Sequence, residues 1–289
     1  MKSMNTNRRK RTSTSWDKVA FWYDDLLETG KNYQRDVILP DLLSVLAVEN
    51  GDKVLDLACG QGFFSRATRD AGADVVGVDI SHELIDIARN YEKGSIGQTE
   101  GHARPLTDLR GIRSEYAPQF SSQREIKYFT APSDKLDFIP DGSVDKIVLV
   151  LALQNIEKVS ETLAECSRVL RGVGSLVIVL NHPALRVLKE SSWGFDEAAA
   201  IQYRRVNRYM SEFKVAINMH PGEDKSSFTT SFHRPLQFYF KALKGAGFVV
   251  RTLHELISNK VSQPGKRSTA ENVARKEIPL FMTIEAGKS

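Results

Sequence analysis

Cysteine is scarce in this chain of 289 residues, which contains only Cys59 and Cys166. Two cysteines are too few for the disulfide framework of a small secreted protein or for the four thiolate ligands of a structural zinc ion. The basic N-terminus is not followed by the apolar segment of a signal peptide. We therefore expect a reduced, cytoplasmic protein, and the residue pattern gives no reason to expect a bound metal.

Long apolar runs are also missing. The longest extends from Ile147 to Leu153. It falls far short of the roughly 20 residues that a membrane-spanning helix needs, and it is typical of a buried strand. We expect no segment of the chain to lie within a membrane.

The excess of positive charge is small, with 40 basic and 36 acidic residues. Five basic residues precede the first acidic residue, Asp17, and the rest of the chain is close to neutral. We interpret residues 1–15 as a basic, disordered tail on a neutral globular body. Folds that bind nucleic acid usually carry their basic residues on a structured face, so this pattern does not favour a nucleic-acid partner. Binding of nucleic acid through the basic tail is the alternative.

From residue 53 onward, short β-rich runs alternate with amphipathic helical stretches. Runs of Val, Ile and Leu predict five strands, and residues at helical spacing between them predict helices on both faces of a parallel sheet. The predicted strands cover residues 53–58, 73–81, 126–131, 143–153 and 174–182, and the predicted helices cover 63–71, 82–92 and 159–170.

The end of the chain departs from this alternation. A predicted helix over residues 236–246 is followed by two apolar strands, 248–256 and 278–286, with no helix expected between them. The fold class is therefore α/β: a doubly wound, Rossmann-like sheet of seven mostly parallel strands, with a C-terminal antiparallel β-hairpin.

Three segments lie outside the repeating pattern, and such segments commonly determine the substrate. Two helices are predicted before the first strand, over residues 16–27 and 33–46. Residues 93–124 are polar and lack periodicity, which indicates a surface insertion, whereas residues 183–234 place aromatic side chains among polar ones, which we interpret as a substrate lid. We expect residues 16–289 to form a single domain.

One motif, VLDLACGQGFFS, carries chemical information. It places Asp56 near the end of a buried strand, and Gly60 and Gly62 in the turn before a helix, where glycine lets the backbone approach a ligand closely. About twenty residues later, the run VVGVDIS ends the second strand with Asp79, whose carboxylate suits the two hydroxyls of a ribose. These residues predict a nucleoside ligand at the carboxyl ends of the strands.

Two cofactor classes use this geometry. A dinucleotide site has the pattern G-x-G-x-x-G, and the third glycine is absent here. The carboxylate of Asp56 beneath the turn would repel a pyrophosphate and attract an ammonium group. The sequence therefore favours S-adenosylmethionine, which carries an ammonium and a sulfonium, over a nicotinamide dinucleotide.

At these residues the chain resembles the class I S-adenosylmethionine-dependent methyltransferases, over about residues 54–180. VLDLACGQG resembles the first motif of the family, with Ala58 where glycine is commonest, and VVGVDIS resembles the second. The resemblance implies that Asp134 meets the adenine amino group and that Tyr23, in the opening WDKVAFWYD, covers the methionine end. The cofactor-binding residues that it implies are Tyr23, Asp56, Ala58, Cys59, Gly60, Gln61, Gly62, Asp79, Ile80, Ser133, Asp134, Leu151 and Leu153.

A sulfonium methyl group is already activated for transfer. The protein must mainly hold a nucleophile about 3 Å from the methyl carbon, and a general base is needed only when the nucleophile is protonated. His182 follows the fifth predicted strand and Asn155 follows the fourth, at the edge of the sheet where ligands bind, so both are candidates for catalysis. A hydrogen bond that stabilises the loop is the alternative role of each. Cys59 and Cys166 are expected to be packed residues rather than nucleophiles.

We expect the transfer of a methyl group from S-adenosylmethionine to a small-molecule acceptor that the aromatic lid encloses. An RNA or protein methyltransferase guided by the basic tail is one alternative, and a non-catalytic S-adenosylmethionine-binding protein is another. Arg204, Arg205 and Arg208 would either bind an anionic acceptor or form a solvated helix face.

Overall fold

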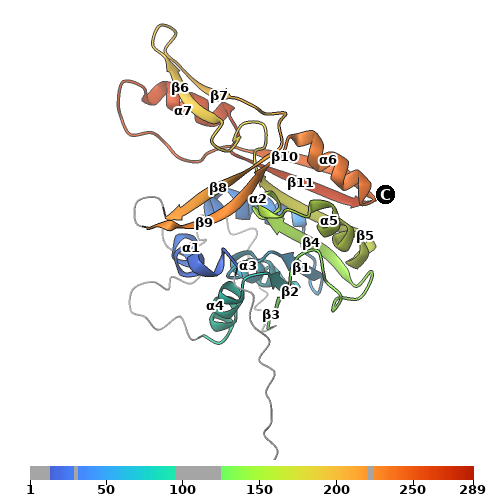
Figure 1. Cartoon of the computed structure of the whole chain (residues 1–289). Coiled ribbons are helices and arrows are strands. Elements are labelled where there is room, and N and C mark those ends of the chain that lie inside the picture. Colours follow the sequence, from blue (N-terminus) through green and yellow to red (C-terminus); the bar gives the residue numbers. More distant parts are fainter. Residues whose placement is uncertain (1–13, 29–31, 95–124, 221–223) are drawn as a thin grey trace, which may run out of the picture.

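The computed structural model describes residues 14–28, 32–94, 125–220 and 224–289 (Figure 1). Nearly all of the predicted tail, and the predicted insertion from residue 95 onward, lie outside the described residues. None of the described helices is long and apolar enough to cross a membrane.

A seven-stranded sheet forms the centre of the molecule. Its strands are β1 (Lys53–Leu57), β2 (Asp74–Asp79), β3 (Lys127–Thr130), β4 (Val144–Val150), β5 (Leu170–Asn181), β10 (Phe248–Leu256) and β11 (Phe281–Lys288). They lie in the order β10-β11-β5-β4-β1-β2-β3 (Figure 1). Strands β1 to β5 pair in parallel, and β11 is antiparallel to both β5 and β10. The predicted, mostly parallel sheet is confirmed.

Helices cover both faces of this sheet, as expected for strands that are paired in parallel. The helices of the chain are α1 (Ala20–Glu28), α2 (Leu39–Leu46), α3 (Phe63–Asp70), α4 (His82–Glu92), α5 (Val159–Val169), α6 (Leu236–Gly245) and α7 (Ser268–Glu277). Helices α2 to α6 cover the sheet, whereas α1 packs on α4 and α7 lies beside β7. Successive side chains of β4 point to opposite faces of the sheet, and each face has its own hydrophobic core. Ile147 and Leu149 pack with α5 and α6, whereas Val148 and Val150 pack with α2, α3 and α4.

The connection between the last two strands differs from the prediction. Strands β10 and β11 do pair antiparallel, from Phe248 opposite Lys288 to Leu256 opposite Phe281. However, α7 lies between them, so the expected direct connection is wrong. Only Ala274 of this helix is buried. A helix with so small a buried face shows little apolar periodicity in the sequence, which explains why the pattern did not reveal it.

The segment that we interpreted as a lid contains four further strands, β6 (Ser191–Asp196), β7 (Ile201–Val206), β8 (Phe213–His220) and β9 (Asp224–His233). They form two separate two-stranded sheets; β6–β7 lies beside α7, and β8–β9 extends toward α1 (Figure 1). Arg204 and Arg205 therefore lie on a strand, and the expected helix face at these residues is wrong. Strands β6 and β7 bury no side chain, and the buried residues of β9 are the polar Thr229, Ser231 and His233, so these strands lack the apolar alternation that sequence patterns detect.

Close packing across β2 and β3 gives a test of this sheet. A Cβ atom on Gly77 would lie 2.5 Å from Cδ1 of the buried Tyr128 ring, whereas one on Gly172 would meet no atom within 4 Å. We expect Gly77→Ala to lower the free energy of unfolding by about 1–3 kcal/mol through overpacking. Gly172→Ala, the matched control, should change it by less than about 0.5 kcal/mol. Urea unfolding measures both; equal effects would contradict the packing described.

Candidate functional site

A cavity of about 480 Å³ lies at the carboxyl ends of β1, β2 and β4. The last residues of these strands, Leu57, Asp79 and Val150, form part of its lining. Trp16 and Tyr23, near the N-terminus, and Thr229 and Thr230 of β9 also line it. The cavity is therefore bounded by the sheet, by the segment around α1 and by the β8–β9 pair.

The glycine turn after β1 forms one wall of the cavity. Ala58, Gly60 and Gly62 all have positive φ, of 60°, 57° and 82° respectively, a conformation that glycine adopts without strain and alanine does not. A Cβ atom on Gly60 would lie 3.4 Å from Cε1 of Tyr23. The absence of a side chain at residue 60 thus keeps the space between the turn and Tyr23 open.

Asp79 ends β2 and lines the same cavity. Its Oδ2 accepts a hydrogen bond from the Gly60 amide at 2.9 Å, and its Oδ1 accepts one from the Ser81 amide at 2.8 Å. Burial raises the pKa of this carboxyl group, and the backbone hydrogen bonds oppose that rise. Because each carboxylate oxygen has two lone pairs, the group keeps acceptor capacity for the hydroxyls of a ligand.

Three residues of the first motif support the turn from behind and do not line the cavity. Asp56 is 2% exposed, and its Oδ2 accepts a hydrogen bond of 2.5 Å from the Ser65 hydroxyl, which joins β1 to α3. Cys59 is buried, and its Sγ lies close to Gly77 of β2. Gly62 precedes the first residue of α3 and has no room for a side chain, since a Cβ atom there would lie 2.3 Å from the Tyr128 hydroxyl.

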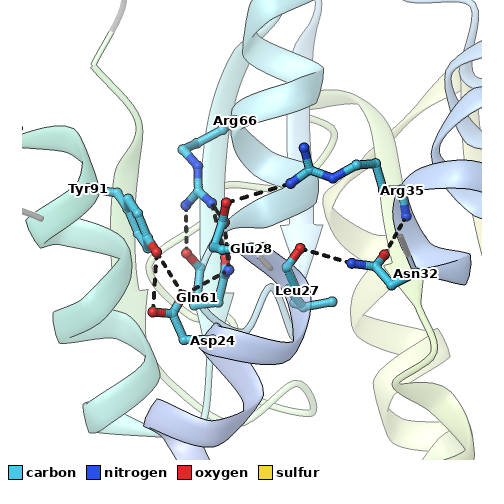
Figure 2. A network of polar contacts seen from close by, with 8 residues as sticks. All are labelled: Asp24, Leu27, Glu28, Asn32, Arg35, Gln61, Arg66 and Tyr91. Carbon is cyan, nitrogen blue, oxygen red and sulfur yellow. Dashed lines mark hydrogen bonds and ion pairs between the residues drawn. The ribbon is translucent and has the colours of Figure 1, made fainter. Parts of the chain in front are cut away.

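Gln61 is fully buried and joins the glycine turn to α1 (Figure 2). Its Nε2 donates to Asp24 Oδ1 and to Glu28 Oε1, both at 3.0 Å. Arg66 donates to the Gln61 carbonyl at 2.8 Å and to Glu28 at 2.5 Å, and its guanidinium lies 4.2 Å from the centre of the Tyr91 ring. The Tyr91 hydroxyl donates to Asp24. We call these five residues the α1 clamp, because they fix the helix that carries Tyr23 over the cavity.

The segments after β3 and β4 form the opposite wall. Ser133 and Asp134 line the cavity, as do Ile80 and Leu151. The Ser133 and Thr162 hydroxyls are 2.9 Å apart, and Lys158 donates to Asp134 at 2.7 Å. Leu153, by contrast, is 1% exposed and belongs to the core beneath the site.

The structure separates the two candidate catalytic residues. Asn155 lines the cavity, and its Nδ2 donates to the Leu151 carbonyl at 3.3 Å. His182 does not line the cavity; it is 5% exposed and its Nε2 is 2.8 Å from Glu255 Oε1. Its Nδ1 is buried without a hydrogen-bond partner. A catalytic role of either residue stays a prediction.

Several residues that line the cavity were not singled out from the sequence. Trp16 packs edge-on against Tyr23, with ring centres 5.8 Å apart, and the aromatic run WDKVAFWYD was a usable signal for it. Thr229 and Thr230 had no such signal, because β9 was not predicted. In the described residues, no group of three or more His, Cys, Asp or Glu side chains is placed to hold a metal ion.

Comparisons with known proteins agree with this geometry. Residues 55–178 match the family described as "Methyltransferase domain". A demethylmenaquinone methyltransferase of Tropheryma whipplei is 31% identical over 140 residues, which are 48% of this chain and 46% of the relative, so the chain spans about half of that relative's length. A ubiquinone biosynthesis O-methyltransferase of Aromatoleum aromaticum is 22% identical over 174 residues, or 60% of this chain and 63% of the relative.

A solved structure with a similar fold is that of an S-adenosylmethionine dependent methyltransferase from Mesorhizobium loti. It aligns with a TM-score of 0.59 and 22% identity, and the alignment covers 86% of this chain and 95% of that one. The matched residues include the glycine turn and Asp79, which define the cavity. Over residues 55–178 the chain is thus similar to a methyltransferase domain, and its fold is similar to that of a solved S-adenosylmethionine dependent methyltransferase.

The hydrogen bonds of the α1 clamp lead to a prediction about the stability of α1. Gln61→Leu keeps the size of the side chain but removes both donors, which leaves Asp24 and Glu28 with fewer partners. We expect faster amide hydrogen exchange in α1 and a loss of about 1–3 kcal/mol in the free energy of unfolding. Gln237→Leu, at an exposed position of α6, is the control. Unchanged exchange in α1 would show that Gln61 does not hold this helix.

Asp56 predicts a pH dependence of stability. Burial raises its pKa to about 7 in the folded protein, whereas an unfolded Asp titrates near about 3.9. Between these values the folded state binds a proton that the unfolded state does not, so this group lowers stability as pH rises, by at most about 1.4 kcal/mol per pH unit. The Asp56→Asn variant has no ionisable group at this position, so it does not lose stability in this way as pH rises. Its stability relative to wild type, measured by urea unfolding, should increase from pH 4 to 7; a constant difference would contradict the assignment.

Proposed function

We propose that this protein transfers the methyl group of S-adenosylmethionine to a small-molecule acceptor. The match of residues 55–178 to a methyltransferase domain supports the cofactor. The observation that carries the proposal is the placement of Asp79 and the Gly60 turn in one cavity, at the carboxyl ends of parallel strands, where α/β sheets bind nucleosides.

The residues of the cavity suit each part of this cofactor. Asp79 would accept hydrogen bonds from the ribose hydroxyls, and the backbone at Gly60 would lie against the methionine end beneath Tyr23. Ser133 and Asp134 would face the adenine, with Ile80 and Leu151 as apolar contacts. The cofactor supplies a methyl group already activated by the sulfonium, so the protein contributes mainly position and the exclusion of water.

The acceptor side of the cavity carries polar but weakly basic groups. Asn155, Thr229 and Thr230 present amide and hydroxyl groups that orient a ligand without removing a proton. Burial and the nearby Asp79 raise the pKa of Tyr23 to about 12, so it remains a neutral phenol near pH 7. These groups favour an acceptor whose nucleophilic atom ionises readily by itself.

The size of the site supports a small acceptor. A cavity of about 480 Å³ that α1 and β9 help to enclose lies within the range of small-molecule sites. The demethylmenaquinone and ubiquinone methyltransferases among the relatives are named for quinones, which supports an acceptor with a single ring system of that kind. We therefore propose a hydroxylated aromatic or quinol acceptor.

Binding of the cofactor provides a direct test. Calorimetric titration with S-adenosylhomocysteine should give a micromolar dissociation constant, and NAD should bind far more weakly. Asp79→Ala should weaken the complex about 10- to 100-fold, because hydrogen bonds to a charged acceptor are lost. Asp137→Ala, at an exposed side chain beyond β3, is the matched control. Tighter binding of NAD, or unchanged affinity in a folded Asp79→Ala variant, would refute the proposed site.

Turnover is tested separately with S-adenosylmethionine labelled in its methyl group. We expect label to pass to simple catechols or quinols and not to transfer RNA. Transfer of label to RNA alone would refute the small-molecule acceptor while leaving the cofactor site in place.

A further inference from the structure

Beyond the end of β5, three cations gather around aromatic rings. Arg186 lies over Phe281 at 5.3 Å from the ring centre, Arg204 over Trp193 at 5.2 Å, and Lys260 over Tyr33 at 4.6 Å. We call Arg186, Arg204 and Lys260 the Arg186 cluster. None of the three forms an ion pair with another described residue, although charged pairs are common elsewhere on the molecule.

Arg186 is the least satisfied member of the cluster. Its side chain is half-buried, and among the described residues its guanidinium has neither a carboxylate partner nor a hydrogen bond. Burial lowers its pKa, and the positive charge of Arg204 lowers it further, yet an arginine remains charged at neutral pH. The contact with Phe281 contributes at most about 2 kcal/mol. The guanidinium nitrogens are not among the fully buried polar atoms, so a ligand can reach them.

The neighbouring residues hold the cluster in place. Arg204 donates to the Leu185 carbonyl at 2.9 Å and to the Ser191 hydroxyl at 2.7 Å, so its position beside Arg186 is fixed. The Tyr33 hydroxyl is 3.0 Å from that of Ser258, which fixes the ring under Lys260. Among the described residues, the guanidinium of Arg186 and the ammonium of Lys260 have no hydrogen-bond partner, so both keep donors for a ligand.

The cluster lies on the same edge of the sheet as the cavity. The end of β4, at Val150 and Leu151, lines the cavity, and the Leu151 amide donates to Val179 of β5. Arg186 follows β5 by a short turn, in which its amide donates to the His182 carbonyl. Arg186 lies over Phe281, the first residue of β11, and β11 is the neighbour of β5 on the side away from β4. Adjacent strands are about 4.8 Å apart, so the cluster lies one to two strand spacings beyond the cavity, away from the ribose site at β2.

We propose that the Arg186 cluster binds an anionic group, a carboxylate or a phosphate, on the methyl acceptor. The free guanidinium of Arg186 matches such a group with two parallel hydrogen bonds, and Arg204 and Lys260 add favourable charge. This inference rests on the proposed function, because it takes the acceptor to span from the cavity to β5. It narrows the acceptor class to acidic aromatic compounds, in contrast to the neutral quinones for which the relatives are named.

The experiment compares ring compounds that differ in charge. Benzoate, phenyl phosphate and the neutral benzamide are titrated into the full-length protein, with and without S-adenosylhomocysteine. We expect benzoate or phenyl phosphate to bind at least about tenfold more tightly than benzamide, since hydrogen bonds between charged groups are the strong ones. Of the two anions, the one that binds more tightly identifies the group on the acceptor.

Variants then assign the preference to Arg186. Arg186→Gln should lose about 10- to 100-fold in affinity for the anion and keep its affinity for S-adenosylhomocysteine. Arg205→Gln, at an exposed position of the adjacent β7, should keep both. Equal binding of benzoate, phenyl phosphate and benzamide by the wild type would overturn the proposal without any variant. So would an Arg186→Gln protein that binds the anions like the wild type.

The two proposals can fail independently. A wild-type protein that did not bind S-adenosylhomocysteine would refute the proposed function, and the anion titration without cofactor would still decide the Arg186 cluster. Conversely, normal binding of S-adenosylhomocysteine with no preference for anions would refute the cluster alone.

Discussion

Gly60 and Asp79 meet where the ends of β1 and β2 lie side by side, and the hydrogen bond between them fixes the floor of the cavity. The carboxylate holds a turn whose residues have positive φ, and the turn in turn orients the carboxylate. Both oxygens are engaged by backbone amides, so the side chain cannot rotate away from the site. A nucleoside that binds here meets an acceptor already in position, and preorganisation of this kind reduces the entropic cost of binding.

The other features of the site depend on this turn remaining in place. Asp56 secures it from β1 through Ser65, and Gln61 secures α1 to it. Tyr23 thereby covers a turn to which its own helix is attached. On the opposite side, the Ser231 hydroxyl lies 3.4 Å from the Gln154 carbonyl, and Arg234 donates to the Glu157 carbonyl at 3.1 Å, so β9 is joined to the segment after β4. Helix α1 and strand β9, which enclose the cavity from two sides, are therefore each hydrogen-bonded to segments that line it.

The sequence predicts the framework better than it predicts which side chains face the ligand. Apolar runs locate the seven strands of the sheet. The pattern is strong in β1, β4 and β5, which are buried on both faces, and weaker in the largely exposed β10. The resemblance in the first motif does not distinguish Gly60, which lines the cavity, from Gln61 and Asp56, which support it from behind. That distinction depends on contacts with α1 and α3. Contacts between segments distant in sequence have no local signal.

The same reason explains the elements that the pattern missed. Helix α7 and strands β6 and β7 bury almost no residue, and the buried residues of β9 are polar, so hydrophobic burial hardly constrains their sequences. The cations of the Arg186 cluster come from residues 186, 204 and 260, and no spacing rule relates them. His182 illustrates the converse. Its place after β5 made it a candidate for catalysis, yet its imidazole faces Glu255 of β10.

The position of β11 also constrains the order in which this chain acquires its structure. This strand is the last in sequence, but it lies between β5 and β10 and pairs with both along most of its length. During synthesis on the ribosome, β10 therefore emerges before its neighbour in the sheet, and it stays unpaired until β11 has left the exit tunnel. An unpaired apolar strand is a template for association with other chains. The unpaired edge of β10 during this interval is therefore a site at which a chaperone would prevent association between chains.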